Sequence, residues 1–258
     1  MGNYNSLQLR EIFHLEFLRW LGKKIKAENY ILKGGVNLRF FFNSFRYSQD
    51  LDLDISGIRV DILKDIVMKI LQSPSFQDTL KSFGVERVVH PDISKAKQTE
   101  TTQRFKIHLI TASGEDLFTK VEFSRRGFKG KVVVQAVSDV ILRAYKMPPL
   151  LAPHYEIRSA IMQKIEALAA RSVIQARDVF DLFILTPQYN DVVTNIPVSN
   201  KLTKAYDNIF EINFEQFRDT VLVYLAPEDR ATYEKMASWD EIKLKVSSFI
   251  DELRKRYA

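Results

Sequence analysis

Three aspartates alternate with apolar residues in the run Asp50-Leu51-Asp52-Leu53-Asp54-Ile55. Alternation is the period of a β-strand, so this segment predicts a strand with all three carboxylates on one face. Side chains two apart on a strand leave the backbone about 6.5–7 Å apart, close enough for Asp50 and Asp52 to share one pair of cations. Hard carboxylate oxygens favour Mg²⁺ or Mn²⁺. Aspartate is a poor strand former, which argues against the alternative of a merely solvated acidic face.

Gly34 and Gly35 lie upstream of the aspartates, between a predicted strand at residues 30–32 and a predicted helix at 36–42. Glycine lacks a Cβ, so the chain can turn sharply there and present backbone N–H groups to phosphate oxygens at the start of the helix. Most Gly-Gly pairs are ordinary turns. Together with the paired aspartates, however, this turn predicts a site for a nucleoside triphosphate and a divalent cation, as nucleotidyl transfer requires.

Further polar residues could complete such a site. Glu122 alternates with apolar neighbours in a predicted strand and could add a third metal-binding carboxylate, although pairing with Lys120 on a solvated face explains it nearly as well. Arg39, Arg46 and Ser48 lie between the Gly-Gly turn and the aspartates, where guanidinium and hydroxyl groups could reach phosphates. For Arg39 the alternative is a position on the helix surface.

The composition favours a polyanionic partner such as RNA, because 38 Lys and Arg against 32 Asp and Glu give the 258-residue chain a formal charge of +6. A basic run at residues 125–131 could grip an RNA backbone, although a solvated turn explains it as well.

The absence of cysteine excludes disulfides and thiolate chemistry, and the four histidines lack metal-ligand spacing. No apolar run reaches the roughly 18 residues of a membrane helix, so we expect a cytoplasmic protein without a membrane partner.

Residue periodicity predicts an α+β protein of two modules, with strand patterns in the first and helical patterns in the second. We place the boundary after residue 137, which gives a sheet-containing domain at 1–137 and a helical domain at 138–258 that closes the cleft. Residues 147–153, with three prolines, are predicted as a loop, and further helices follow residue 201. The other predicted helices are 7–26 with Ser6 as N-cap, 58–71, and 157–185 with a break at 172–175; the other predicted strands are 105–109, 120–123 and 132–134.

Two ordered motifs carry a resemblance to a known family, the abortive-infection toxins called AbiEii or AbiGii. The first motif is Lys33-Gly34-Gly35, then Leu38-Arg39, then Arg46-Tyr47-Ser48-Gln49-Asp50-Leu51-Asp52-Leu53. The second is Lys164, then Ala167-Leu168, Arg171 and Ala176-Arg177-Asp178-Val179-Phe180-Asp181-Leu182. The resemblance covers residues 30–56 and 157–186. One departure is Val36, where the family often has a small hydroxyl residue, so that backbone groups alone would bind phosphates there.

The resemblance implies a nucleotidyltransferase fold of the DNA polymerase beta type, in which a mixed β-sheet is flanked by helices. It implies Asp50 and Asp52 as metal ligands, whereas the apolar neighbours of Asp52 and Asp54 alone would fit that pair slightly better. It further implies a toxin that transfers a nucleoside monophosphate from a nucleoside triphosphate to RNA, with tRNA favoured. Such toxins are held in check by a separately encoded, cognate antitoxin.

The second motif has two interpretations. By resemblance, Lys164 contacts the triphosphate, while Asp178 and Asp181 line the same cleft and orient Lys164 and Arg177 or position the acceptor. Residues three apart are neighbours on one helix face, which permits this convergence. The alternative is a structural salt-bridge cluster of Arg177, Asp178 and Asp181 that joins the helical module to the sheet, and both interpretations can hold together.

Other functions stay open on the sequence. The same metal site could transfer a nucleotide to a small molecule or to a protein side chain. In a different class, a catalytically inactive module would act by binding an antitoxin or RNA. That module would bind its partner regardless of substitutions at Asp50 and Asp52, whereas an enzyme would depend on both.

Overall fold

The computed structural model of the protein describes residues 4–93, 96–189 and 199–257. The chain forms two compact units: a sheet unit, Met1–Phe41 with Tyr47–Tyr155, and a helical unit, Phe42–Arg46 with Glu156–Ala258. Five residues between the Gly-Gly helix and the aspartate strand therefore belong to the helical unit. The chain leaves the sheet unit after Phe41, returns at Tyr47, and leaves it again after Tyr155.

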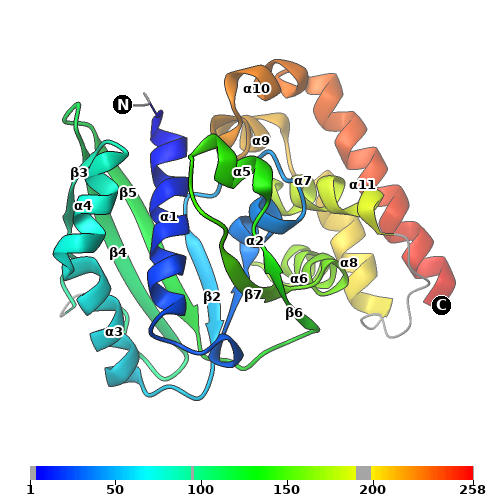
Figure 1. The fold of residues 1–258 in the computed structure, drawn as a ribbon. Helices are drawn as coiled ribbons and strands as arrows, with labels where there is room; N and C mark the ends of the chain where they lie inside the picture. The colour runs from blue at the N-terminus through cyan, green and yellow to red at the C-terminus, as the bar shows by residue number, and fades with distance from the viewer. Residues whose placement is uncertain (1–3, 94–95, 190–198, 258) are drawn as a thin grey trace. The chain divides into compact units, whose positions relative to one another are not determined.

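Within the described residues, seven strands form one mixed sheet in the order β3-β4-β5-β2-β1-β7-β6 (Figure 1). β2 pairs in parallel with β5, and β1 in parallel with β7, whereas all other neighbours are antiparallel. The strands are β1 (Tyr30–Lys33), β2 (Leu51–Ile55), β3 (Val85–Val89), β4 (Thr102–Thr111), β5 (Asp116–Ser124), β6 (Val132–Ala136) and β7 (Leu151–Tyr155). The sheet thus confirms the predicted mixed α+β fold and places the aspartate strand β2 beside the strand of Glu122.

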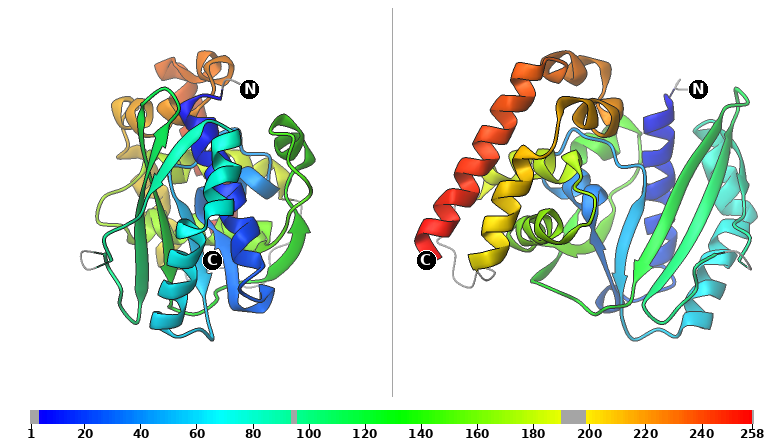
Figure 2. Two further views of the ribbon diagram at one scale, coloured as in Figure 1. Left: turned by 60° about the vertical axis from the view of Figure 1, so that its left-hand side comes forward. Right: turned by 180° about the vertical axis from the view of Figure 1, so that it is seen from behind.

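One face of this sheet is covered by α1 (Ser6–Gly22), α3 (Val60–Gln72) and α4 (Pro74–Ser82) (Figures 1 and 2). Their apolar side chains share one core with inward-facing strand residues such as Leu51 and Leu53, which are fully buried. Because successive side chains of a strand point to opposite faces, Asp52, between these leucines, projects from the other face. The unit also contains η1 (Ala27–Asn29), α2 (Gly34–Phe41) and α5 (Asp139–Ala144).

The segment Phe42–Arg46 belongs to the helical unit. The Phe45 ring lies 5.5 Å from the rings of Phe180 and Tyr233, and the Gln188 amide donates a hydrogen bond to the Phe42 carbonyl. The described elements of this unit are α6 (Ile157–Ala170), α7 (Ala176–Leu185), η2 (Thr186–Gln188), α8 (Ser199–Phe210), α9 (Phe214–Thr220), η3 (Leu222–Tyr224), α10 (Pro227–Tyr233) and α11 (Met236–Tyr257). The gap between α6 and α7 confirms the break predicted at 172–175.

The main difference from the sequence prediction is β7. Residues 147–153 were expected to be a loop and strands were expected to end near Ser138, but Leu151–Tyr155 forms a strand between β1 and β6. Pro153 accounts for the error, because proline within a run argues against a central strand. β7 belongs to the sheet, so the two compact units divide after Tyr155 rather than at the expected 137/138 boundary.

Smaller differences concern element ends and two elements that the pattern did not predict. The N-cap of α1 is Asn5 rather than Ser6, since the Asn5 side chain accepts hydrogen bonds from the backbone N–H of Leu7 and Gln8. α4 and β3 were not expected, although Ser73 caps α4 and proline occupies its first turn. Every helix in the described part of the chain is too short or too polar to span a bilayer.

Candidate active site

Three of the predicted carboxylates lie at neighbouring positions of the sheet unit. Asp52 lies directly opposite Glu122 in the parallel β2–β5 register and opposite Lys33 in the antiparallel β1–β2 register. Adjacent strands are about 4.8 Å apart, so the side chains of Asp52 and Glu122 project side by side from the face that the core helices do not cover. Asp50 immediately precedes β2.

Asp50 is held in place through its own backbone and that of its neighbour. The Ser48 hydroxyl donates a hydrogen bond of 2.9 Å to the Asp50 carbonyl, and the Thr119 hydroxyl of β5 donates one of 2.8 Å to the Gln49 carbonyl. His14 lies 2.8 Å from the same Thr119 hydroxyl, and burial lowers the His14 pKa to about 3, so its ring is neutral. Ser48 therefore positions the carboxylate turn in this structure.

Two basic residues contact these carboxylates. Lys120 of β5 places its Nζ 3.0 Å from an Asp50 carboxylate oxygen and 3.8 Å from a Glu122 oxygen. Arg104 of β4, opposite Glu122 in register, donates a 2.7 Å hydrogen bond to it. The expected alternative pairing of Glu122 with Lys120 is thus present, with Arg104 as the closer partner. Across the described residues, no three carboxylates or imidazoles converge into a preformed metal site.

The electrostatic environment of Asp52 is unfavourable to its negative charge. Burial raises the pKa of Asp52 above its ordinary value, and the charges of Asp50 and Glu122 raise it further, against the opposing effect of Lys120 and Lys33. A partly buried carboxylate flanked by two others has an excess of negative charge that a divalent cation would relieve. The oxygen donors of Asp50 and Asp52 therefore fit Mg²⁺ or Mn²⁺.

The Gly-Gly turn lies against Asp52. Gly34 adopts φ +68°, in the left-handed region that favours glycine, and begins α2. A Cβ at Gly34 would sit 2.9 Å from an Asp52 carboxylate oxygen, closer than side-chain carbons approach such atoms. The absence of a side chain at this position lets the backbone turn approach the carboxylate. Two motifs separated in the sequence are thus juxtaposed.

Asp54, the third aspartate of the run, has structural partners. Its carboxylate is 2.5 Å from the Lys33 ammonium and accepts a 2.6 Å hydrogen bond from the Tyr155 hydroxyl of β7. The same hydroxyl accepts a hydrogen bond from the Lys129 backbone N–H. Asp54 is only 5% exposed. It therefore ties β2 to β1 and β7, while Asp50 and Glu122 share the site with Asp52.

Arg39 also has a structural environment. Its guanidinium donates two hydrogen bonds to Glu11 of α1, at 2.7 and 3.3 Å, and stacks 4.3 Å from the Tyr47 ring centroid. The Tyr145 hydroxyl donates to the same Glu11 carboxylate at 2.6 Å. In this structure Arg39 therefore joins α2 to α1, and its predicted role in binding phosphate stays a prediction.

The second motif forms a charge cluster inside the helical unit. The Lys164 ammonium lies 2.9 Å from an Asp178 oxygen and 2.6 Å from an Asp181 oxygen. Arg46 donates to both Asp181 oxygens at 2.8 and 3.0 Å, and Arg171 lies 3.1 Å from Asp178. Both aspartates are completely buried. The structure thus brings Lys164, Asp178 and Asp181 together as expected, and it adds Arg46, which was expected to reach phosphates.

The cluster is electrostatically balanced. Burial alone would raise the pKa of Asp181, but Arg46 and Lys164 more than offset this and hold it below its ordinary value. Burial would likewise lower the pKa of Lys164, and the two aspartates hold it above its ordinary value instead. Arg177 stands apart: it is half-buried on α7 and makes no hydrogen bond or ion pair with the residues that the structure describes.

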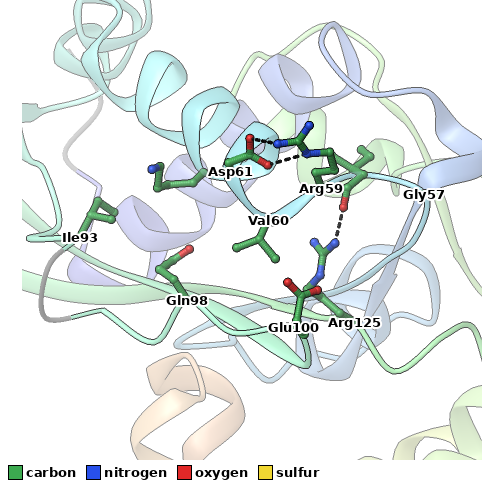
Figure 3. A pocket seen from close by; sticks show the side chains of 10 residues that line it. Gly57, Arg59, Val60, Asp61, Ile93, Gln98, Glu100 and Arg125 are labelled. Atoms are coloured by element: carbon green, nitrogen blue, oxygen red, sulfur yellow. Dashed lines mark hydrogen bonds and ion pairs between the residues drawn. The ribbon is translucent and has the colours of Figure 1, made fainter.

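A cavity of about 750 Å³ in the sheet unit lies beyond the end of β2, whereas Asp50 precedes the start of this strand (Figure 3). A five-residue strand is about 16 Å long, so the cavity is separate from the carboxylates. The two arginines that line it are engaged with protein groups. Arg59 makes two hydrogen bonds to Asp61, and Arg125 donates to the Ile58 carbonyl and, at 2.8 Å, to Gln103. We therefore assign no chemistry to it.

Solved structures of other proteins share the fold of this chain. JHP933 from Helicobacter pylori is 18% identical, with a TM-score of 0.62 over 99% of this chain and 94% of its own. MenT4, a nucleotidyltransferase toxin from Mycobacterium tuberculosis, is 15% identical, with a TM-score of 0.59 over 96% of this chain and 86% of its own. These likenesses show a shared fold. No curated protein matches the chain.

The family assignment rests on the sequence. The family model described as nucleotidyl transferase AbiEii toxin, type IV toxin–antitoxin system, matches residues 16–244. The match includes both motifs, the carboxylates of the sheet unit and the buried cluster of the helical unit. The chain therefore belongs to the AbiEii nucleotidyltransferase toxin family of type IV toxin–antitoxin systems.

Proposed function

We propose that the protein is a metal-dependent nucleotidyltransferase that transfers a nucleoside monophosphate from a nucleoside triphosphate to RNA, with tRNA the favoured acceptor, and that a cognate antitoxin restrains it. The observation that carries the proposal is the approach of the Gly34 turn to Asp52, beside Asp50 and Glu122. A turn that can bind phosphate and a carboxylate group that favours a cation meet at one place, which metal-assisted transfer to a hydroxyl requires.

Each residue of this site has a role in the proposed reaction. Asp50 and Asp52 would hold Mg²⁺ or Mn²⁺, which when bound neutralises charge on the triphosphate. The backbone N–H groups of Gly34 and Gly35 donate to phosphate oxygens at the start of α2. The acceptor hydroxyl oxygen forms a bond to the α-phosphorus as the bond to pyrophosphate breaks, and a carboxylate of the site takes the hydroxyl proton. Lys164 and Arg177 are further candidates for binding phosphate oxygens.

RNA as the acceptor is supported by the basic run after β5. Arg126, Lys129 and Lys131 are exposed there, and Phe128 between them is 37% exposed. Basic side chains that attract phosphates, interleaved with an aromatic ring that can stack on a base, are typical of surfaces that bind single-stranded nucleic acid. The overall charge of +6 points in the same direction.

The test is incorporation of label from each nucleoside triphosphate in turn into total cellular RNA, with Mg²⁺, by the intact protein and by Asp52→Asn. We expect label in a discrete RNA band with one preferred triphosphate, and none with the variant. Label that enters a small molecule or the protein itself instead of RNA would overturn the proposed acceptor. No label with any triphosphate, together with RNA binding that is the same for both proteins, would identify an inactive binding module.

A substitution at Gly34 tests the role of the turn. Gly34→Ala should lower the transfer rate by about 10²-fold, because displacing reacting groups by about 1 Å has that effect. Left-handed strain from alanine at φ +68° should also destabilise the protein by roughly 1–3 kcal/mol. Gly114→Ala is the matched control, since Gly114 has φ +82° with nothing near its missing Cβ. Equal loss of activity in both variants would show that strain, and not contact with Asp52, is responsible.

A further inference from the structure

Lys120 contacts carboxylates of the site at which a metal ion is proposed to bind. It projects from β5 two residues before Glu122, on the same face of the sheet, and its ammonium lies between the carboxylates of Asp50 and Glu122, at 3.0 and 3.8 Å. It also opposes the rise in the Asp52 pKa. One ammonium thus interacts electrostatically with all three carboxylates of the site.

The neighbouring basic residues do not share this position. Among the described residues, the guanidinium of Arg104 contacts only Glu122, and Lys33 is paired with Asp54. Lys106 lies directly opposite Lys120 in the β4–β5 register, but it is exposed and makes no ion pair with the described residues. Among these cations, Lys120 alone contacts Asp50, one of the two proposed metal ligands.

We propose, on the basis of the proposed function, that Lys120 is a built-in counter-ion that competes with the divalent cation for Asp50 and Glu122. In the metal-free protein it neutralises part of the carboxylate charge. When a divalent cation binds, two positive charges close together repel each other, so the ammonium must leave Asp50. Lys120 therefore weakens metal binding in the absence of nucleotide, and a nucleoside triphosphate offsets this by supplying additional negative charge.

The proposal is tested by titrating the full-length protein with MnCl₂ alone, without nucleotide, and measuring free Mn²⁺ by electron paramagnetic resonance. Lys120→Met should bind Mn²⁺ at least about tenfold more tightly than the intact protein, because a positive charge close to the metal is removed. Lys120→Arg keeps the charge and should stay within about threefold of the intact protein. Lys106→Met removes the same charge from the same face without the contact to Asp50 and should also stay within about threefold.

The outcomes separate this inference from the proposed function. Tighter binding by Lys120→Met alone, abolished when Asp52→Asn is added, supports the inference, even if the intact protein binds too weakly to measure. If the intact protein binds Mn²⁺ through Asp52 and Lys120→Met binds it equally well, the inference fails while the proposed metal site stands. The inference also fails if Lys106→Met gains as much as Lys120→Met. If no variant binds Mn²⁺ without nucleotide, the inference fails, and the proposed metal site is then judged by the transferase assay with Asp52→Asn. Thermal unfolding of each variant shows that the titrated protein is folded.

Discussion

Replacing Asp52 by asparagine is expected to lower nucleotidyl transfer by at least about 10³-fold and, at the same time, to stabilise the metal-free protein. Activity falls because the amide has lost the negative charge that the proposed cation requires, while its size still fits against Gly34. Stability rises because asparagine carries no charge to be repelled by Asp50 and Glu122 in a partly buried position. Single stabilising substitutions commonly contribute about 0.5–2 kcal/mol, and we expect a gain in this range.

The stabilisation by Asp52→Asn should depend on pH in a defined direction. Because the pKa of Asp52 is raised above 3.8 in the folded protein, the folded state binds the proton more tightly than the unfolded state. The stabilisation of the folded state by this proton is fully present below pH 3.8. It is lost as the pH rises through the pKa that Asp52 has in the folded protein. Asparagine removes this loss, so its advantage should be absent at low pH and largest near neutrality.

Thermal unfolding of both proteins in the presence of a chelator, from acid to neutral pH, measures this effect. An increase in Tm of a few degrees near pH 7 is expected, since about 1 kcal/mol shifts Tm by roughly 2–4 °C at this size. A variant that is less stable than the intact protein at neutral pH would show that the Asp52 charge is already compensated. A variant that keeps full transferase activity would remove Asp52 from the catalytic site.

Asp181→Asn is expected to have the opposite and larger effect on stability, a loss of about 3–5 kcal/mol. Asp181 is completely buried between Arg46 and Lys164, and its removal leaves the Arg46 guanidinium without its carboxylate partner in the interior. The pKa of Asp181 is held below its ordinary value, so this stabilisation is present above that value and is lost as the pH falls through the folded pKa. The difference between the two proteins should therefore shrink in acid.

Asp251→Asn is the control for this measurement. It makes the same chemical change in a helix of the same unit, but Asp251 forms its ion pair with Lys255 at the surface, where such pairs contribute little. We expect Tm to fall by at least about 6 °C for Asp181→Asn and by much less for Asp251→Asn. Equal changes would show that the buried cluster is not a structural requirement of the helical unit.

Local patterns were sufficient for the parts of the site that lie close together in the sequence. The alternation around Asp52 and the Gly-Gly break predicted β2 and the turn before α2, because period and steric freedom are properties of a few neighbouring residues. The break between α6 and α7 was predicted for the same reason. β7 was missed because Pro153 argues locally against a strand, while pairing with β1 and β6 stabilises it.

The counter-ions of the site depend on pairings between distant segments. Arg104 meets Glu122 through the β4–β5 register, and Lys120 meets Asp50 only because β5 lies beside β2. Arg46 follows the Gly-Gly helix closely in sequence, yet its partner Asp181 is on α7. The closeness of Arg46 to the Gly-Gly turn in the sequence suggested a phosphate ligand. Its pairing with Asp181 could not be predicted, because nothing local indicates that the chain enters the helical unit at this point.

Because residues 42–46 belong to the helical unit, this unit is not formed by one continuous stretch of chain that follows the sheet unit. A chain shortened to end at Tyr155 would still contain Phe45 and Arg46, but without the rings of Phe180 and Tyr233 or the carboxylate of Asp181. An apolar ring and a guanidinium would then be exposed within the connection from the Gly-Gly helix to the aspartate strand. An exchange of the helical part between two relatives would therefore leave these contacts unmatched unless residues 42–46 were exchanged with it.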